Sequence, residues 1–235
     1  MITIDNLTKK FGEKTALNID AYQLQNGEIL GLVGNNGAGK TTLFRLLLDL
    51  LKAESGTITI DEIQVDQSEQ WKTFTGSYID NSFLIDYLTP EEFFYFIGKM
   101  YGLNKEVVDE RIETFTHFMN GEIMGQKKFI RNFSAGNKQK IGIISAMIHH
   151  PKVLILDEPF NFLDPSSQSI IKRILRKYNE ETHATILISS HNLNHTIDIS
   201  SRIALLESGV IIKDLENIDK AAEEELEAYF NVDDE

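Results

Sequence analysis

The chain has 235 residues, 42% of them hydrophobic, which is enough to bury the core of one large domain. Its formal net charge of -13 repels a phosphate backbone at long range, so we expect no nucleic acid partner. The chain contains no cysteine, which excludes disulfides and thiolate metal sites.

The first third of the chain predicts strands around one glycine-rich loop and one helix. The N-terminus lacks the basic and apolar segments of a signal peptide. Period-2 alternation marks the outer strands, whereas the strand before the glycines is apolar throughout and is expected to be buried. The predicted strands are 1–7, 17–24, 27–33 and 55–65, and the predicted helix, which is rich in leucine, is 40–52.

The middle of the chain has a helical texture. Thr89 and Pro90 fit the cap and the first residue of a helix, and they predict a helix over 89–103. A further helix is predicted over 105–119. The aromatic run Phe93 to Phe96 is expected mostly in the core of this region, with a docking surface as the alternative.

The last part returns to alternating strands and helices. The predicted strands are 152–159 and 184–191, the predicted helix is 165–180, and a hairpin is predicted over 202–215 with Ser208-Gly209 at its turn. Four apolar residues of the acidic tail fall at helical spacing. They are Ile218, Ala222, Leu226 and Tyr229. This spacing predicts a docked amphipathic helix with a frayed end.

These elements predict a single α/β domain over residues 1–235. Its catalytic core would comprise about 1–80 and 151–215, and a helical subdomain of about 82–150 would be inserted between the two halves. The acidic tail would cover 216–235.

The stretch GNNGAGKTT matches the phosphate-binding pattern G-x-x-x-x-G-K-[ST] between a buried strand and a helix. Its glycines let backbone amides wrap a β-phosphate. Lys40 is expected at the β- and γ-phosphates, Thr41 at Mg²⁺ and Thr42 at the α-phosphate. The predicted nucleotide-binding residues of this loop are Gly34, Asn35, Asn36, Gly37, Ala38, Gly39, Lys40, Thr41 and Thr42. The alternative is a glycine turn before an ordinary helix.

A second motif ends the apolar strand KVLILDEP. Asp157 is expected beside Mg²⁺, as the carboxylate that ends such a strand in P-loop NTPases is. Glu158 follows at the strand end, where open α/β sheets carry their chemistry, and it is predicted to polarise the attacking water as general base. Glu158 and Lys40 are therefore candidate catalytic residues. A strand end followed by a turn is the structural alternative.

With both motifs in place, residues 1–212 resemble the ATP-binding subunit of an ABC transporter. The resemblance implies a P-loop NTPase mixed-sheet core with an N-terminal antiparallel β-subdomain and an inserted helical subdomain. FSAGNKQK is similar to the family's LSGGQ signature through Ser134 and Gly136, while Phe133, Ala135 and Asn137 depart from it. The resemblance implies that two subunits pack head to tail, and that Ser134 and Gly136 meet the nucleotide of the other subunit. An ordinary helix cap is the alternative for Ser134.

Three further positions follow from the resemblance. His191 matches the switch histidine that contacts the γ-phosphate and steadies Glu158, and a buried structural histidine is the alternative. Asp164 matches the D-loop, and it is equally a sound helix cap before Pro165. Phe11 matches the aromatic residue that stacks on adenine, with a plain core residue as the alternative.

Asn81 departs from the family pattern. The family usually has glutamine there, in contact with Mg²⁺ or the attacking water, and proline in place of Asp80. Asparagine is one methylene shorter. Two outcomes stay open: Asn81 binds with adjusted geometry, or its loop is displaced and the contact is missing.

The resemblance implies an ATPase that uses ATP and Mg²⁺, pairs with a second ATP-binding subunit, and drives a separate transmembrane permease. The longest apolar run, Ile141 to Ile148, is far below the ~20 residues that cross a bilayer. We therefore expect a cytoplasmic protein that lies on the inner face of the membrane through its permease. The segment LTPEEFFYFIGKMYGL is similar to that of drug- and polysaccharide-export subunits, which favours export over import. The alternative is a soluble ABC ATPase of the iron-sulfur assembly type.

Overall fold

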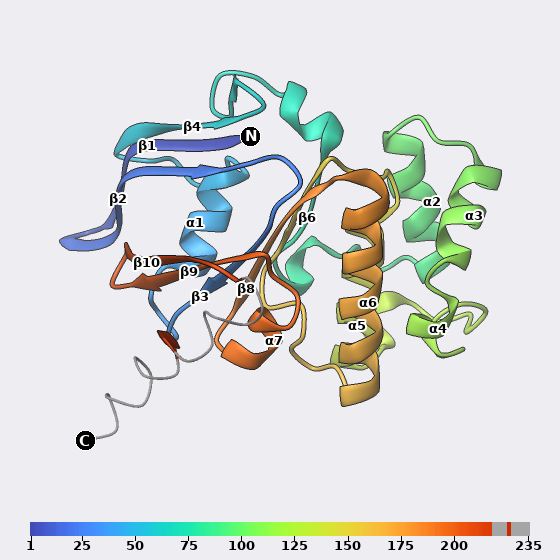
Figure 1. The fold of residues 1–235 in the computed structure, drawn as a ribbon. Coiled ribbons are helices and arrows are strands. Elements are labelled where there is room, and N and C mark those ends of the chain that lie inside the picture. The colour runs from blue at the N-terminus through green and yellow to red at the C-terminus, as the bar shows by residue number, and fades with distance from the viewer. Residues whose placement is uncertain (218–224, 227–235) are drawn as a thin grey trace.

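The computed structural model describes residues 1–217 and 225–226, in which ten strands form two separate sheets (Figure 1). The smaller sheet is antiparallel, with the order β2-β1-β4-β5. Its strands are β1 (Ile2–Phe11), β2 (Lys14–Leu24), β4 (Ser55–Ile60) and β5 (Ile63–Gln64). This arrangement agrees with the antiparallel N-terminal sheet expected above.

The strand predicted over 55–65 is in fact a hairpin, so that prediction was wrong in its second half. Asp61 and Glu62 both have positive φ, 49° and 66°, which reverses the chain between β4 and β5. Two consecutive left-handed residues make the two-residue turn that suits a β-hairpin. Neither residue is glycine, so the turn was not visible in the sequence.

The larger sheet has the order β10-β9-β3-β8-β7-β6 and is parallel except for β10. Its strands are β3 (Ile29–Val33), β6 (Thr75–Tyr78), β7 (Val153–Leu156), β8 (Thr185–Ser190), β9 (Arg202–Glu207) and β10 (Val210–Glu216). Every residue of β3, β7 and β8 is buried, as expected for the middle of a parallel sheet. The predicted β9–β10 hairpin is confirmed.

Helix α1 (Lys40–Leu47) lies between the two sheets (Figure 1) and shares a hydrophobic cluster with both. It ends five residues earlier than the predicted 40–52, because Asp49 turns to a φ of 52° and leaves the helix. The apolar pattern continues beyond the end of the helix because Leu48 and Leu51 still pack against the same cluster.

The remaining α-helices of the described residues lie on the other side of the larger sheet, some against its strands and some against other helices. They are α2 (Pro90–Met100), α3 (Lys105–Glu113), α4 (Thr116–Met119), α5 (Ala135–Met147), α6 (Pro165–Thr182) and α7 (Leu193–Ile197). Helices α2, α3 and α4 gather at the end of the molecule away from β1 and β2 (Figure 1). The helix predicted over 105–119 is broken into α3 and α4, and α7 was not predicted.

The helical region shares one hydrophobic cluster with the larger sheet. Phe93 and Phe94 are buried in it, as predicted, whereas Phe96 is exposed. The subdomain boundaries given above stay a prediction. Of the tail residues at helical spacing, Leu226 is buried against Ile197 and Ile203, and the other three lie outside the described residues.

Candidate functional site

The glycine-rich loop is held in shape by close backbone contacts. A Cβ at Gly34 would lie 2.2 Å from the carbonyl oxygen of Leu206, and one at Gly39 would lie 2.9 Å from that of Ala16. Gly39 also has a φ of 114°, which side chains rarely adopt. Gly37 faces open space within 4 Å. The loop is therefore packed on one side and free for a ligand on the other.

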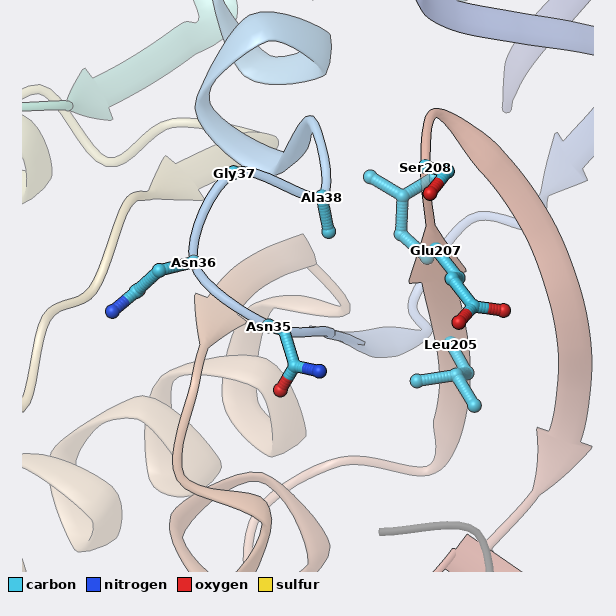
Figure 2. Close-up of a pocket in the computed structure, with 8 residues that line it drawn as sticks. Asn35, Asn36, Gly37, Ala38, Leu205, Glu207 and Ser208 are labelled. Carbon is cyan, nitrogen blue, oxygen red and sulfur yellow. The ribbon is translucent and has the colours of Figure 1, made fainter. Parts of the chain in front are cut away.

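The loop is braced from behind by the turn of the β9–β10 hairpin. The amide of Gly209 donates to the carbonyl of Ala38 at 2.9 Å, and Asn18 donates to the carbonyl of Gly209 at 2.8 Å. A small cavity of about 180 Å³ on this side is lined by residues 35–38 of the loop and residues 205–208 of the hairpin, most of which Figure 2 labels. The side chain of Asn36 points away from the hairpin in this view. This cavity is too small for a nucleotide and lies behind the loop.

Lys40 is the first residue of α1, and its ammonium group is directed into the loop. Nζ donates to the carbonyl oxygens of Gly34 and Asn35 at 2.6 and 3.3 Å. Nζ also lies 3.7 Å from Oε1 of Glu158, and the Lys40 side chain is only 6% exposed. A buried ammonium held by carbonyls and one carboxylate is suited to bind a polyphosphate.

Thr41 lies directly against the end of β7. Its hydroxyl donates to Oδ2 of Asp157 at 2.5 Å, and Ser189 on β8 donates to the other oxygen of that carboxylate. Burial raises the pKa of Asp157, while the hydrogen bonds from Ser189 and Thr41 oppose this effect. Ser189 was not singled out in the sequence, because a serine inside an apolar strand gives no signal of its own.

The oxygens of Thr41 and Asp157 are the kind of donors that Mg²⁺ prefers, so these residues fit the ion. Within the described part of the chain, no three histidine, cysteine or acidic residues are grouped for metal binding. Water and phosphate oxygens would supply further ligands, as is usual for Mg²⁺ in nucleotide sites.

Both the backbone and the side chain of Glu158 are held by contacts with neighbouring residues. Its amide donates to the hydroxyl of Ser189 at 2.9 Å, and Oε2 lies 2.9 Å from Nδ1 of His191. The backbone adopts a φ of 48°, which costs a residue other than glycine on the order of 1–2 kcal/mol. The strained backbone directs the carboxylate toward Lys40 and His191. The predicted partnership of Glu158 and His191 is thus present in the geometry, while their catalytic roles stay a prediction.

A second cavity, of about 410 Å³, opens on the ligand side of the glycine-rich loop. Its walls include Phe11, Ala16, Gly37, Lys40, Thr41, Thr42, Glu158 and Ser208. Phe11 is 52% exposed and therefore is not a core residue, and Nζ of Lys9 lies 5.2 Å from its ring centroid. An exposed aromatic ring at one end and a phosphate-binding loop at the other match the two ends of a nucleotide.

The signature residues form a capped helix start. The hydroxyl of Ser134 accepts from the amide of Asn137 at 3.2 Å, so the alternative role as helix cap is real. Asp164 likewise caps α6 by accepting from Ser167 at 3.0 Å. Among the described residues, neither Ser134 nor Asp164 lines the cavity of Phe11 and Lys40. A role of either residue at a nucleotide therefore needs a second subunit.

Asn81 begins a short 3-10 turn, Asn81–Phe83, after β6. Its amide oxygen accepts from the hydroxyl of the buried Tyr78 at 2.7 Å. Asp80, in place of the family's proline, caps the turn through Ser82 and pairs with Arg45 of α1 at 3.1 Å. The Asn81 oxygen has a second lone pair that this hydrogen bond does not use, and the role of Asn81 at Mg²⁺ stays a prediction.

Comparisons with known proteins identify one family. A family model described as ABC transporter matches residues 17–161, more than half of the chain. The bacitracin transport ATP-binding protein BcrA of Enterococcus faecalis is 34% identical over 219 residues, 92% of this chain and 69% of that protein. The linearmycin resistance ATP-binding protein LnrL of Bacillus subtilis is 32% identical over 213 residues, 90% and 68% of the two chains.

A solved structure shares the fold. It is a dimeric ATP-binding cassette in a post-hydrolysis state, bound to ADP and Pi, with a TM-score of 0.82 and 24% identity over 93% of this chain and 99% of that one. The named relatives act in transport or resistance, so the comparisons give no support to the iron-sulfur assembly alternative. Among the described residues, no helix is both long and apolar enough to cross a membrane.

Proposed function

The chain belongs to the ATP-binding proteins of ABC transporters, which hydrolyse ATP, and we propose that it powers export through a separate permease. In this proposal two ATP-binding subunits close head to tail on two nucleotides. The permease holds the pair at the inner face of the membrane. The alternative of a soluble assembly ATPase has no observation in its favour.

The observation that carries the proposal is the convergence of Lys40, Thr41, Asp157, Glu158 and His191 at one edge of the larger sheet. A cation, a hydroxyl, two carboxylates and an imidazole meet there, next to the cavity of Phe11. This set contains the groups that phosphoryl transfer to water requires: charge compensation, oxygen ligands and a base.

Each group has a distinct part in the proposed reaction. Lys40 and the loop amides bind the phosphates, and Thr41 and Asp157 would hold Mg²⁺, which neutralises phosphate charge when bound. The carboxylate of Glu158 accepts the proton of the attacking water, and His191 keeps that carboxylate in its orientation. Phe11 stacks on the base, and Thr42 binds the α-phosphate.

Two subunits complete the site. The hydroxyl of Ser134 and the amide of Gly136 lie at the positive end of α5, which favours a γ-phosphate from another chain. Asp164 lies two residues after Phe162, whose carbonyl faces Gly136, and it belongs to the same proposed interface. The cassette of similar fold was solved as a dimer, which supports the same assembly for this chain.

An exposed apolar surface is available for the permease. Phe83, Ile85 and Tyr87 are exposed on the loop after β6, and Phe129 is exposed beside them. The backbone amide of Ile130 donates to the carbonyl of Leu88 at 2.8 Å, so the two segments form one surface. We infer that cytoplasmic segments of the permease contact this surface, since contiguous apolar area on a protein surface marks an interaction site.

One relative is named for bacitracin transport and another for linearmycin resistance. These names favour an antibiotic compound as the exported substrate. Expression of the chain with its permease in a sensitive strain, followed by measurement of antibiotic tolerance, tests this part.

The central test uses the full chain and its Glu158→Gln variant. The wild-type protein is expected to hydrolyse ATP, and the variant is expected to bind ATP, form dimers and lose turnover by about 10²-fold or more. Glu181→Gln, which changes an exposed carboxylate on α6, serves as the control. An ATP-loaded Glu158→Gln protein that stays monomeric at high concentration would contradict the head-to-tail pair.

A further inference from the structure

Helix α5 contacts the backbone of Glu158 through a buried glutamine. The side chain of Gln139 is 5% exposed, and its Nε2 donates to the carbonyl oxygen of Glu158 at 3.1 Å. Gln139 lies on the second turn of the helix that begins after Ser134. Gln139 was not singled out in the sequence analysis, because a glutamine inside a helix is ordinarily a surface residue.

The peptide group that Gln139 contacts belongs to a residue with a strained backbone. Glu158 has a φ of 48°, a conformation that a residue other than glycine keeps only when its surroundings enforce it. The carbonyl of Glu158 accepts from Gln139 and from the amide of Asn161 at 3.2 Å, and its own amide donates to Ser189. Ser189 and Gln139 therefore fix the two peptide groups on either side of the Glu158 Cα, and the direction of the carboxylate follows from them.

The same helix meets the segment after Glu158 a second time. A Cβ at Gly136 would lie 2.6 Å from the carbonyl oxygen of Phe162, another residue with positive φ, at 64°. The first turn of α5 and the segment 158–162 thus approach each other too closely for any side chain at Gly136. A displacement of the start of α5 would be transmitted to this segment directly.

We propose that Gln139 is a positioning residue, which holds the peptide of Glu158 and couples the start of α5 to the carboxylate that faces Lys40 and His191. The inference rests on the proposed function, in which Ser134 and Gly136 meet the nucleotide of the second subunit. Contact at one nucleotide then reaches, through the hydrogen bond of Gln139, the base that acts at the other.

The test compares three variants of the full chain in steady-state ATP hydrolysis. Gln139→Met keeps the length of the side chain and removes the donor. Gln139→Leu also removes the donor with a different apolar side chain, which covers the case in which the methionine variant folds poorly. Gln168→Met is the matched control, because Gln168 donates at 3.1 Å to the carbonyls of Phe160 and Leu163, in the same segment but not to Glu158.

Both Gln139 variants are expected to lower kcat at least about tenfold with the KM for ATP within about threefold of wild type, because phosphate binding does not involve Gln139. Gln168→Met is expected to keep kcat within about threefold. Wild-type kcat in Gln139→Met, or an equal fall in Gln168→Met, would overturn the inference. Failure of the proposed function has a different signature, since wild type would then lack turnover or Glu158→Gln would keep it.

Discussion

The hydroxyl of Thr41 and the carboxylate of Asp157 lie 2.5 Å apart, although 116 positions separate the two residues. Thr41 follows β3 through the glycine-rich loop, and Asp157 directly follows β7. The intervening strand β8 supplies Ser189, which bonds the same carboxylate. The parallel order of these strands brings their carboxyl ends to one edge, which is where open α/β sheets carry their sites.

Thr41→Val is expected to raise the Mg²⁺ concentration needed for half-maximal ATP hydrolysis by about tenfold or more, because valine keeps the shape and loses the oxygen ligand. A Mg²⁺ titration of the turnover rate measures the effect. Thr73→Val, which changes an exposed hydroxyl in the 3-10 helix Gln70–Phe74, is the control. An unchanged Mg²⁺ requirement in Thr41→Val would remove this residue as a ligand.

Phe11→Ala is expected to weaken ATP binding about fivefold, since loss of stacking on a base is worth on the order of 1 kcal/mol. Thermal stability should change little because the ring is half exposed. Equilibrium binding of a fluorescent ATP analogue checks the prediction. Leu50→Ala, another exposed apolar residue, is the comparison, and equal affinities in the two variants would count against stacking.

Gly142→Ala is expected to destabilise the fold by about 2 kcal/mol, because a Cβ there would lie 2.0 Å from Cε2 of Tyr78. The cost outweighs the gain of about 1 kcal/mol that alanine brings to a helix. Denaturant unfolding measures the change. Gly121→Ala supplies the contrast, since its φ of 67° carries a conformational cost but its Cβ would meet nothing within 4 Å.

The burial of His149 predicts that acid lowers the stability of the fold. Burial lowers the pKa of His149 to about 4, and its ring stacks on Tyr101 with centroids 3.7 Å apart. The unfolded chain binds a proton at this residue near pH 6.5, whereas the folded chain does so only near pH 4. Titration of His149 therefore leaves the free energy of unfolding unchanged above pH 6.5. It lowers this free energy by up to about 3 kcal/mol as the pH drops from 6.5 to 4.

The variant His149→Phe keeps a ring beside Tyr101 and removes the titrating group. The difference in unfolding free energy between wild type and this variant should change across that pH range and stay flat from pH 7 to 8. Taking the difference cancels the carboxylates that dominate acid unfolding in both proteins. A difference that is constant from pH 4 to 8 would show that His149 titrates as it does in the unfolded chain.

The sequence alone determined the features that depend on neighbouring residues. The glycine-rich loop follows from which residues tolerate its backbone dihedrals and close contacts. The caps Thr89, Ser134 and Asp164 are found where the pattern predicted them, because each cap needs only the amides two or three residues further on. The buried strands β3, β7 and β8 were likewise visible as short apolar runs.

Tertiary structure decided the features that depend on residues far apart in the chain. Only the sheet order brings Asp157 to Thr41, and only the packing of α5 brings Gln139 to the carbonyl of Glu158. The engagement of Asn81 by Tyr78 is also set by the fold, since Tyr78 is held against Gly142. Local patterns constrain the dihedral angles of a few residues at a time, whereas contacts between distant segments form only when the whole core closes.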